Sequence, residues 1–205
     1  MLVKWIRCDV ADSAGFDRGQ QEWADLAGLP GFLGQLGGWS HDGSQVAHIF
    51  SFWVDQDAYE HFMSGAHDAL AQRQVGTWSK IDVRLFERRA DFGQSLAGTS
   101  GSGVLRLAHC VVKPDRVDHF AQVQKTVWNP GMSAAPGCLA GLFGQRGCQE
   151  FLVLTKWVSA AEHARYQAEL FPSLRDRAVP SADLESITGH LVDLEPHWTV
   201  TAGDS

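Results

Sequence analysis

The chain has 205 residues, of which 44% are hydrophobic and 20% are charged. This composition supports a buried core and excludes an intrinsically disordered chain. Asp and Glu outnumber Lys and Arg by 24 to 17, and no basic run occurs, so nucleic acid is not an expected partner. No apolar stretch approaches the ~20 residues that cross a bilayer, and residues 1–7 lack the apolar core of a signal peptide. We therefore expect a cytoplasmic protein without a membrane partner.

An internal repeat divides the chain. Residues 3–10 (VKWIRCDV) resemble residues 105–112 (LRLAHCVV), and a Pro-Gly pair and a Trp recur farther along, at shifts of 102 to 106 positions. This order indicates an ancient duplication. We predict one domain at residues 1–92 and a diverged copy at residues 104–200, joined by a flexible Gly- and Ser-rich linker at residues 93–103.

Each half is predicted to run strand, helix, strand, strand, helix, strand. Short β-rich segments predict the strands, and apolar residues at helical spacing predict the helices. The first half has predicted strands at 3–10, 32–36, 46–53 and 81–87 and helices at 13–27 and 56–74. The second half has predicted strands at 105–112, 139–143, 150–158 and 187–194, one helix after Pro114 and another at 160–178.

This βαββαβ order is typical of the ferredoxin-like α+β fold, whose antiparallel sheet carries its helices on one face only. The bare face also needs a cover. Two such units on one chain can cover each other, which predicts an intrachain pseudo-dimeric α+β barrel. Two independent sandwich domains joined by the linker are the alternative.

The histidines are the main candidates for chemistry. They form no zinc-protease pattern, and we predict no metal site. His61 and His67 lie six residues apart on one predicted helix, so their side chains diverge by roughly 120°. His67 can serve as a base or as an axial ligand, or simply as a satisfied surface histidine. Because Phe171 and Arg165 replace His67 and His61 in the second half, we expect only the first half to have kept a functional pocket; neutral drift would leave the same pattern.

Other polar and aromatic side chains are candidates for the wall of a pocket. Eight tryptophans suit a site for a flat ligand, although a core of large side chains would look the same. His48 alternates with Phe50 on one strand and is either a pocket residue or a core residue with a hydrogen-bond partner. Arg7 and its counterpart His109 could bind an anionic or carbonyl group, or lie at an edge.

The segment 52–62 (FWVDQDAYEHF), followed by His67, resembles the antibiotic biosynthesis monooxygenase superfamily. In that pattern a strand ending in Trp leads into a helix with one His and then a second His. The segment 30–34 (PGFLG) resembles the entry to its second strand. The segments 2–6, 37–39 and 66–70 look more closely like an uncharacterised bacterial family of this type. The resemblance covers residues 1–90 well and residues 104–198 weakly.

The resemblance implies the dimeric α+β barrel and several activities. Some members oxygenate polycyclic aromatic molecules without a cofactor. Others bind or degrade heme, with a helix-two His as iron ligand and a strand-one Asn and strand-three Trp at the pocket. His67 matches that His and Trp53 approximately matches the Trp, but Arg7, Cys8 and Asp9 stand where the Asn would be.

We therefore expect a small-molecule enzyme that binds a flat hydrophobic or aromatic molecule between the sheet and helices of the first half. His67 would abstract a proton, assisted by His48 or His61, with or without oxygen. The expected substrate-binding residues are Trp39, Phe50, Trp53, Arg7 and His109. We expect no cofactor, with heme as a possibility, and either a monomeric pseudo-dimer or a homodimer. The alternative is a non-catalytic barrel that binds heme or a metabolite.

Overall fold

The computed structural model describes residues 1–99 and 101–203. The chain forms two compact units, one of residues 1–86, 97–102 and 192–205 and the other of residues 87–96 and 103–191. These ranges differ from the predicted halves, because two strands each contribute residues to both units. No helix in the described part of the chain is long and apolar enough to span a membrane.

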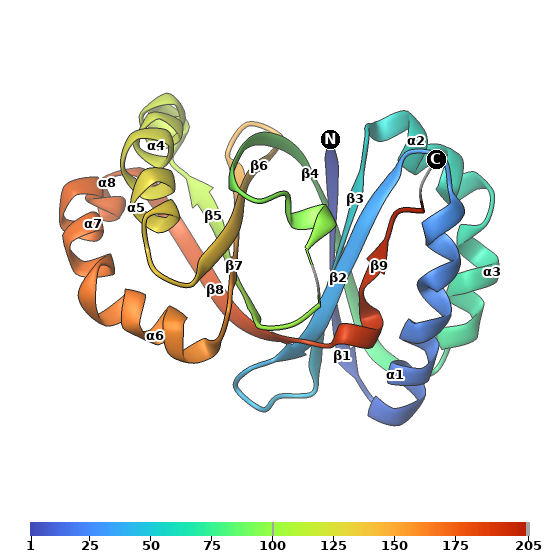
Figure 1. Ribbon diagram of the computed structural model, residues 1–205. Helices are drawn as coiled ribbons and strands as arrows, with labels where there is room; N and C mark the ends of the chain where they lie inside the picture. The colour runs from blue at the N-terminus through green and yellow to red at the C-terminus, as the bar shows by residue number, and fades with distance from the viewer. Residues whose placement is uncertain (100, 204–205) are drawn as a thin grey trace. The chain divides into compact units, whose positions relative to one another are not determined.

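Unit 1 has the predicted βαββαβ order, with its helices on one side of its strands (Figure 1). Its sheet has the order β4-β1-β3-β2, with Leu2 of β1 and Phe32 of β2 both paired with Trp53 of β3. The elements are β1 (Leu2–Val10), α1 (Ser13–Gln21), η1 (Glu22–Gly28), β2 (Phe32–Ser40), β3 (Val46–Trp53), α2 (Gln56–Ser64), α3 (His67–Ala71), η2 (Gln72–Gln74) and β4 (Trp78–Gly93).

Unit 2 repeats this arrangement with the strand order β8-β5-β7-β6. Its first helical region contains a π-helical turn, η5, between two α-helical segments. The elements are β5 (Val104–Val112), η4 (Pro114–Arg116), α4 (Val117–Val123), η5 (Gln124–Trp128), α5 (Asn129–Ser133), β6 (Cys138–Arg146), β7 (Glu150–Trp157), α6 (Ala160–Glu169), α7 (Phe171–Ala178), α8 (Pro180–Asp183) and β8 (Leu184–Leu194).

The strand order closes on itself. Residues Glu87–Gly93 of β4 pair with β6, residues Val192–Leu194 of β8 pair with β2, and β2 also pairs with β3. Within the described residues, each of the eight long strands therefore has two hydrogen-bonded neighbours among the others. The predicted fold class, tandem ferredoxin-like units that form an α+β barrel within one chain, is confirmed.

The second helical region of each half is broken where one helix was predicted. In unit 1, the Asp55 carboxylate caps the start of α2 by accepting a hydrogen bond from the Ala58 amide at 2.9 Å. The helix ends at Ser64, Gly65 follows as its C-cap, and α3 begins at His67. In unit 2, α6 ends before Leu170 and α7 starts with a Pro in its first turn. In unit 1 the break places His67 in the first turn of a new short helix.

The predicted linker is partly packed. Leu96 and Ala97 lie in a short helical turn, η3 (Leu96–Gly98), with only 4% and 7% of their surface exposed. Gly34 of β2 has φ 154°, and a Cβ there would lie 2.2 Å from the Ala97 carbonyl oxygen, so only glycine permits this contact. Residue 100 of the predicted linker lies outside the described residues.

The C-terminal segment adds η6 (Pro196–Trp198) and β9 (Val200–Thr201) to unit 1. Trp198 is fully buried, and its indole Nε1 donates to the Asp17 carboxylate of α1 at 2.8 Å. His197 Nε2 lies 2.6 Å from the same oxygen of Asp17. Burial raises the pKa of Asp17, but these hydrogen bonds outweigh it and hold the pKa below its ordinary value.

Replacing Asp17 by asparagine is expected to lower the free energy of unfolding by about 1 kcal/mol at neutral pH, because both donors lose a charged acceptor. The sign of the pKa shift adds a pH dependence: the contribution is present above the unfolded-state pKa of about 3.9 and is lost as pH falls through the lower folded-state value. Urea unfolding at pH 7 and pH 3 measures both effects. Asp25→Asn, at an exposed carboxylate of the next helical turn, is the control, and an equal loss in both variants would contradict the expectation.

Candidate functional site

Unit 1 contains a cavity of about 360 Å³ between its helices and its sheet. Side chains alternate across a strand, so every second residue of β1 and β3 faces this space. From β1 these are Lys4, Ile6 and Cys8, and from β3 they are Ile49, Ser51 and Trp53. Ile81 and Val83 of β4 also line the cavity while remaining exposed, which places its entrance beside β4.

Aromatic rings form one wall of this cavity. Trp53 is fully buried and stacks on Phe62 of α2, with ring centroids 4.9 Å apart. Tyr59 of α2 and Trp23 of η1 complete the wall. A cavity of about 150 Å³ holds a benzene molecule. The unit 1 cavity has more than twice that volume and therefore has room for a flat molecule of two or more rings.

His67 lies on the cavity wall next to these rings. Its side chain is 21% exposed, and its ring centroid is 5.5 Å from that of Phe62. Its Nδ1 lies 2.9 Å from the Asp68 carboxylate, which favours the tautomer with a proton on Nδ1. Nε2 is then the nitrogen that can accept a proton from a bound molecule.

Lys4 is the functional candidate that sequence reasoning missed. Its side chain is 4% exposed, and its ammonium lies over the rings of Tyr59 and Phe62, 5.4 and 5.9 Å from their centroids. Within residues 1–99 and 101–203, no carboxylate lies within ion-pair distance of Lys4. Burial lowers the pKa of Lys4 from 10.5 to about 8. The cavity therefore holds a cation whose charge a bound anion would neutralise.

Ser51 and Gln20 are among the other polar residues that line the cavity. Ser51 is paired with Lys4 across the sheet, and its Oγ accepts a hydrogen bond from Trp53 Nε1 at 3.2 Å, so its own proton remains free to donate. Gln20 of α1 donates to Gln74, but its Oε1 has no hydrogen-bond partner among the described residues. A buried acceptor of this kind is costly unless a donor reaches it. The site can thus satisfy a ligand that carries both an anionic oxygen and a hydroxyl group.

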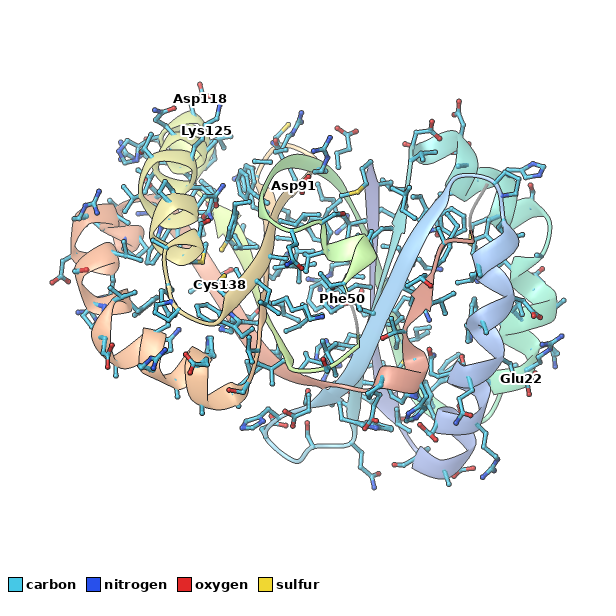
Figure 2. The ribbon with its side chains drawn as sticks, in the orientation of Figure 1. Glu22, Phe50, Asp91, Asp118, Lys125 and Cys138 are labelled. Carbon is cyan, nitrogen blue, oxygen red and sulfur yellow. The ribbon has the colours of Figure 1, made fainter. Side chains whose placement is uncertain are left out.

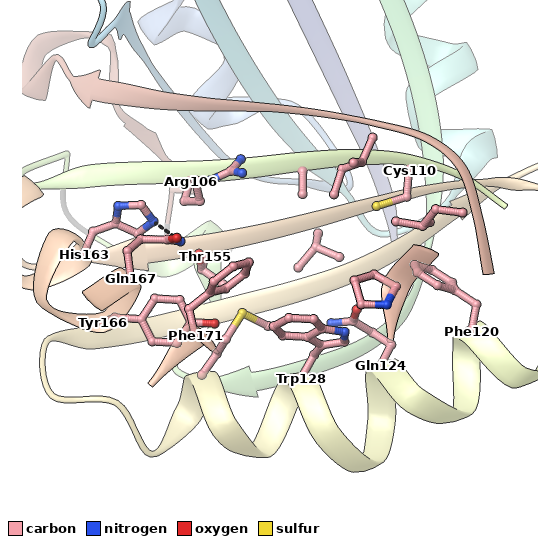
Figure 3. Close-up of a pocket in the computed structure, with 16 residues that line it drawn as sticks. Arg106, Cys110, Phe120, Gln124, Trp128, Thr155, His163, Tyr166, Gln167 and Phe171 are labelled. Carbon is pink, nitrogen blue, oxygen red and sulfur yellow. Dashed lines mark hydrogen bonds between the residues drawn. The ribbon is translucent and has the colours of Figure 1, made fainter. Parts of the chain in front are cut away.

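Unit 2 has its own cavity, of about 150 Å³, so a cavity is not confined to the first half (Figure 3). It lies in the equivalent place, between the helices and the sheet, and its lining includes Arg106, Cys110, Gln124 and Trp128. The expectation for the second half rested on the replacement of His67 and His61 by Phe171 and Arg165. Polar residues at other positions were retained in the second copy.

Residues 2–86 match the model of a family described as Domain of unknown function (DUF4937). Uncharacterized protein YdbC of Bacillus subtilis (strain 168) is 33% identical in a match over 102 residues that covers 47% of this chain and 86% of that protein. The chain belongs to the DUF4937 family. The predicted closer likeness to an uncharacterised bacterial family is confirmed.

Solved structures extend the likeness of this DUF4937 protein over both units. A provisionally assigned monooxygenase of Fusobacterium nucleatum matches 100% of the chain, and 95% of its own, with a TM-score of 0.77 at 11% identity. An anthrone oxidase-like protein matches 99% of the chain and 94% of its own, with a TM-score of 0.69 at 14% identity. The heme-degrading enzyme of Listeria monocytogenes matches 93% of the chain and 98% of its own, with a TM-score of 0.53 at 11% identity.

At these identities the likeness establishes the fold. The neighbours include proteins related to the antibiotic biosynthesis monooxygenases, so the chain has the fold that the resemblance to that superfamily implied. Neither the substrate nor the cofactor follows from the fold. Within the described residues of this DUF4937 chain, no group of three or more His, Cys, Asp or Glu side chains could hold a metal ion.

Three predicted site residues of unit 1 do not reach the cavity, because they lie on the other face of the sheet. Phe50 is fully buried and stacks on Trp5, on the side of the strands away from α1–α3 (Figure 2). His48 is also fully buried, and its two ring nitrogens lie 3.2 Å from Trp5 Nε1 and 3.1 Å from Ser40 Oγ. Arg7 pairs with the Asp9 carboxylate at 2.8 Å. The expectation that His48 assists His67 in one pocket is therefore wrong.

The remaining predicted residues are also displaced from the cavity. His61 is exposed on α2, whereas His67 lies on α3 beyond the helix break. Trp39 packs on Phe16 and Trp198, with ring centroids 5.9 and 5.1 Å away, and does not line the cavity. His109 lies in unit 2, 3.5 Å from the Glu150 carboxylate. Of the predicted set, the unit 1 cavity brings together only His67 and Trp53.

Proposed function

We propose that this protein is a small-molecule enzyme of the antibiotic biosynthesis monooxygenase type, acting on a flat hydrophobic or aromatic substrate in the unit 1 cavity. The observation that supports it most is that His67, with a carboxylate on Nδ1, lines the same aromatic cavity as the buried cation Lys4. One group can remove a proton, and the other can stabilise the negative charge that the proton leaves behind.

The reaction would begin when His67 Nε2 takes a proton from an acidic C–H group of the substrate. The electron pair stays on the substrate as an enolate or phenolate, whose oxygen the Lys4 ammonium and the Ser51 hydroxyl stabilise. Reaction of this anion with dioxygen then converts a ring CH2 to a carbonyl: one oxygen atom enters the substrate, and the other leaves as water with both hydrogens. Without dioxygen, return of the proton to another carbon gives an isomer.

Oxygen uptake with anthrone and related polycyclic phenols tests this proposal. We expect consumption of one dioxygen per substrate and formation of the corresponding quinone. Under anaerobic conditions in D2O, we expect the acidic C–H of the same substrates to exchange faster with protein than without it. The proposal is wrong if neither oxygen uptake nor deuterium exchange exceeds the buffer rate for any member of the panel.

The same histidine favours a second candidate, a non-catalytic barrel that binds heme. A metal-bound histidine commonly donates its second N–H to a carboxylate, and His67 has this arrangement with Asp68. His67 would hold the iron through Nε2, and Lys4 could pair with a heme carboxylate. Heme would supply an iron centre able to bind dioxygen.

A hemin titration distinguishes the two candidates. If His67 ligates heme, adding hemin to the protein should produce a shifted Soret band that saturates at one equivalent, and His67→Ala should abolish the shift. His61→Ala, at an exposed histidine of the preceding helix, is the matched control and should retain it. A Soret band identical to that of hemin in buffer would remove the heme candidate.

A further inference from the structure

We propose that unit 2 contains a second ligand site, which binds a single-ring aromatic carboxylate through Arg106. This proposal does not depend on catalysis in unit 1. It concerns a cavity lined only by residues of unit 2, and it stands on the cavity, on an uncompensated cation inside it and on the repetition of the same polar set in both units.

The cavity is suited to one aromatic ring. Its volume of about 150 Å³ is that of a protein cavity known to bind benzene. Phe120, Trp128 and Phe171 supply ring walls, and the rings of Trp128 and Phe171 have centroids 5.5 Å apart (Figure 3). A ligand ring inserted here would replace contacts with water by contacts with these side chains.

Arg106 provides the charge. It extends from β5 into the cavity lining, and its guanidinium lies against Gly189, where a Cβ would come within 2.1 Å of Nη2. Nη1 donates to the His190 carbonyl oxygen at 3.4 Å. Across the described ranges, no carboxylate lies within ion-pair distance of it. A guanidinium has five N–H donors. Because only one of them makes a hydrogen bond to another described residue, and a long one, two neighbouring N–H groups can still donate to the two oxygens of a planar carboxylate.

The groups around Arg106 do not cancel its charge. Burial lowers the pKa of Arg106, because removal from water disfavours the charged guanidinium. Burial raises the pKa of Cys110 to about 12 and also raises the pKa of Tyr166, so both neighbours stay neutral at pH 7. His163 and Gln167, 3.4 Å apart, form a polar edge of the cavity. A ligand carboxylate would supply the missing negative charge.

Residues of the same chemical types, at equivalent positions, face both cavities. Arg106 pairs with Thr155 across the sheet, as Lys4 pairs with Ser51, and in each unit a Trp indole donates to that hydroxyl oxygen. Thr155 accepts from Trp157 at 2.8 Å, which leaves its proton free to donate to an anion. A buried glutamine and a buried cysteine are also repeated, as Gln20 and Gln124 and as Cys8 and Cys110. A cation beside a free hydroxyl donor thus occurs twice, in two copies that differ at most positions.

Benzoate and its neutral analogue benzamide test the proposal. Both have the same ring, but only benzoate is an anion. The indole N–H signal of Trp128 in two-dimensional NMR, assigned with Trp128→Phe, reports on this cavity alone. We expect a saturable shift with benzoate, at least tenfold weaker affinity for benzamide, and at least a tenfold loss of benzoate affinity in Arg106→Met.

Arg106→Lys, which keeps the charge but not the paired donors, should retain part of the affinity. Lys4→Met, in the other unit, should leave the Trp128 titration unchanged and is the matched control. The proposal is overturned if benzoate and benzamide bind equally to the unaltered protein, a result that needs no variant to fold. It is also overturned if a folded Arg106→Met variant binds benzoate as tightly as before.

Discussion

Replacing His67 by glutamine is expected to lower the rate of substrate deprotonation by roughly 10²–10⁴-fold, the usual contribution of a positioned general base. Glutamine has a similar reach and polarity but cannot accept the proton. The loss should fall on kcat and leave KM nearly unchanged, because the ring walls that bind the substrate are intact. Initial rates of deuterium exchange and of oxygen uptake measure the effect.

The control for this substitution is His61→Gln. His61 is a second histidine of the same helical region but is exposed and lies outside the cavity, so its replacement should change neither rate. Equal losses in both variants would indicate a general effect on the helices. An unchanged rate in His67→Gln would show that another group removes the proton and would remove His67 from the mechanism.

Replacing Lys4 by methionine is expected to raise the free energy of unfolding at pH 7 while weakening the binding of anionic ligands. The fall of the Lys4 pKa from 10.5 to about 8 corresponds to about 3 kcal/mol of unfavourable burial of the charged form. The contacts of the ammonium with Tyr59 and Phe62 stabilise the folded protein by on the order of 1 kcal/mol. We therefore expect Lys4→Met to raise the free energy of unfolding by about 2 kcal/mol. A gain in stability with a loss of function is typical of a residue kept for its chemistry.

The pH dependence of the free energy of unfolding tests whether the buried charge of Lys4 causes the destabilisation. Between about pH 8 and pH 10.5 the unfolded chain binds a proton at Lys4 that the folded protein has released, so the Lys4 contribution to stability rises with pH across this window. Below pH 8 both states are protonated, and the penalty is constant. Lys4→Met should remove this rise, whereas Lys80→Met, at an exposed lysine of β4, should retain it. A Lys4→Met variant less stable than the unaltered protein at pH 7 would contradict the expectation.

The local pattern predicted the elements well. Strand 46–53 was predicted at its observed bounds. For the other hairpin strands, β2, β6 and β7, each predicted end lies within a few residues of the observed end. Hydrophobic alternation and turn residues act over a few positions, so they can be read without knowledge of the fold. The helix predicted over 56–74 is broken at Gly65, because glycine is a poor helix former.

The candidate site was only partly predictable. His48 and Phe50 alternate with Ile49 and Ser51 on β3, and the sequence alone does not say which of the two sets faces the helices. Side chains of period two divide a strand into two faces, but a strand buried on both faces has no polar side to mark its outside. Lys4 was missed for the same reason. A lysine within an apolar strand indicates a site only once it is known which face of the sheet carries its side chain.

The amino-acid sequence by itself determined the repeated βαββαβ units and the α+β class, because both depend on spacing along the chain. Only the tertiary structure decided that β4 and β8 each serve both units, that unit 2 has a cavity of its own, and that Lys4 and His67 share one cavity. These features depend on which residues far apart in the chain come together in the folded protein, and that is set by the packing of helices against a particular face of the sheet.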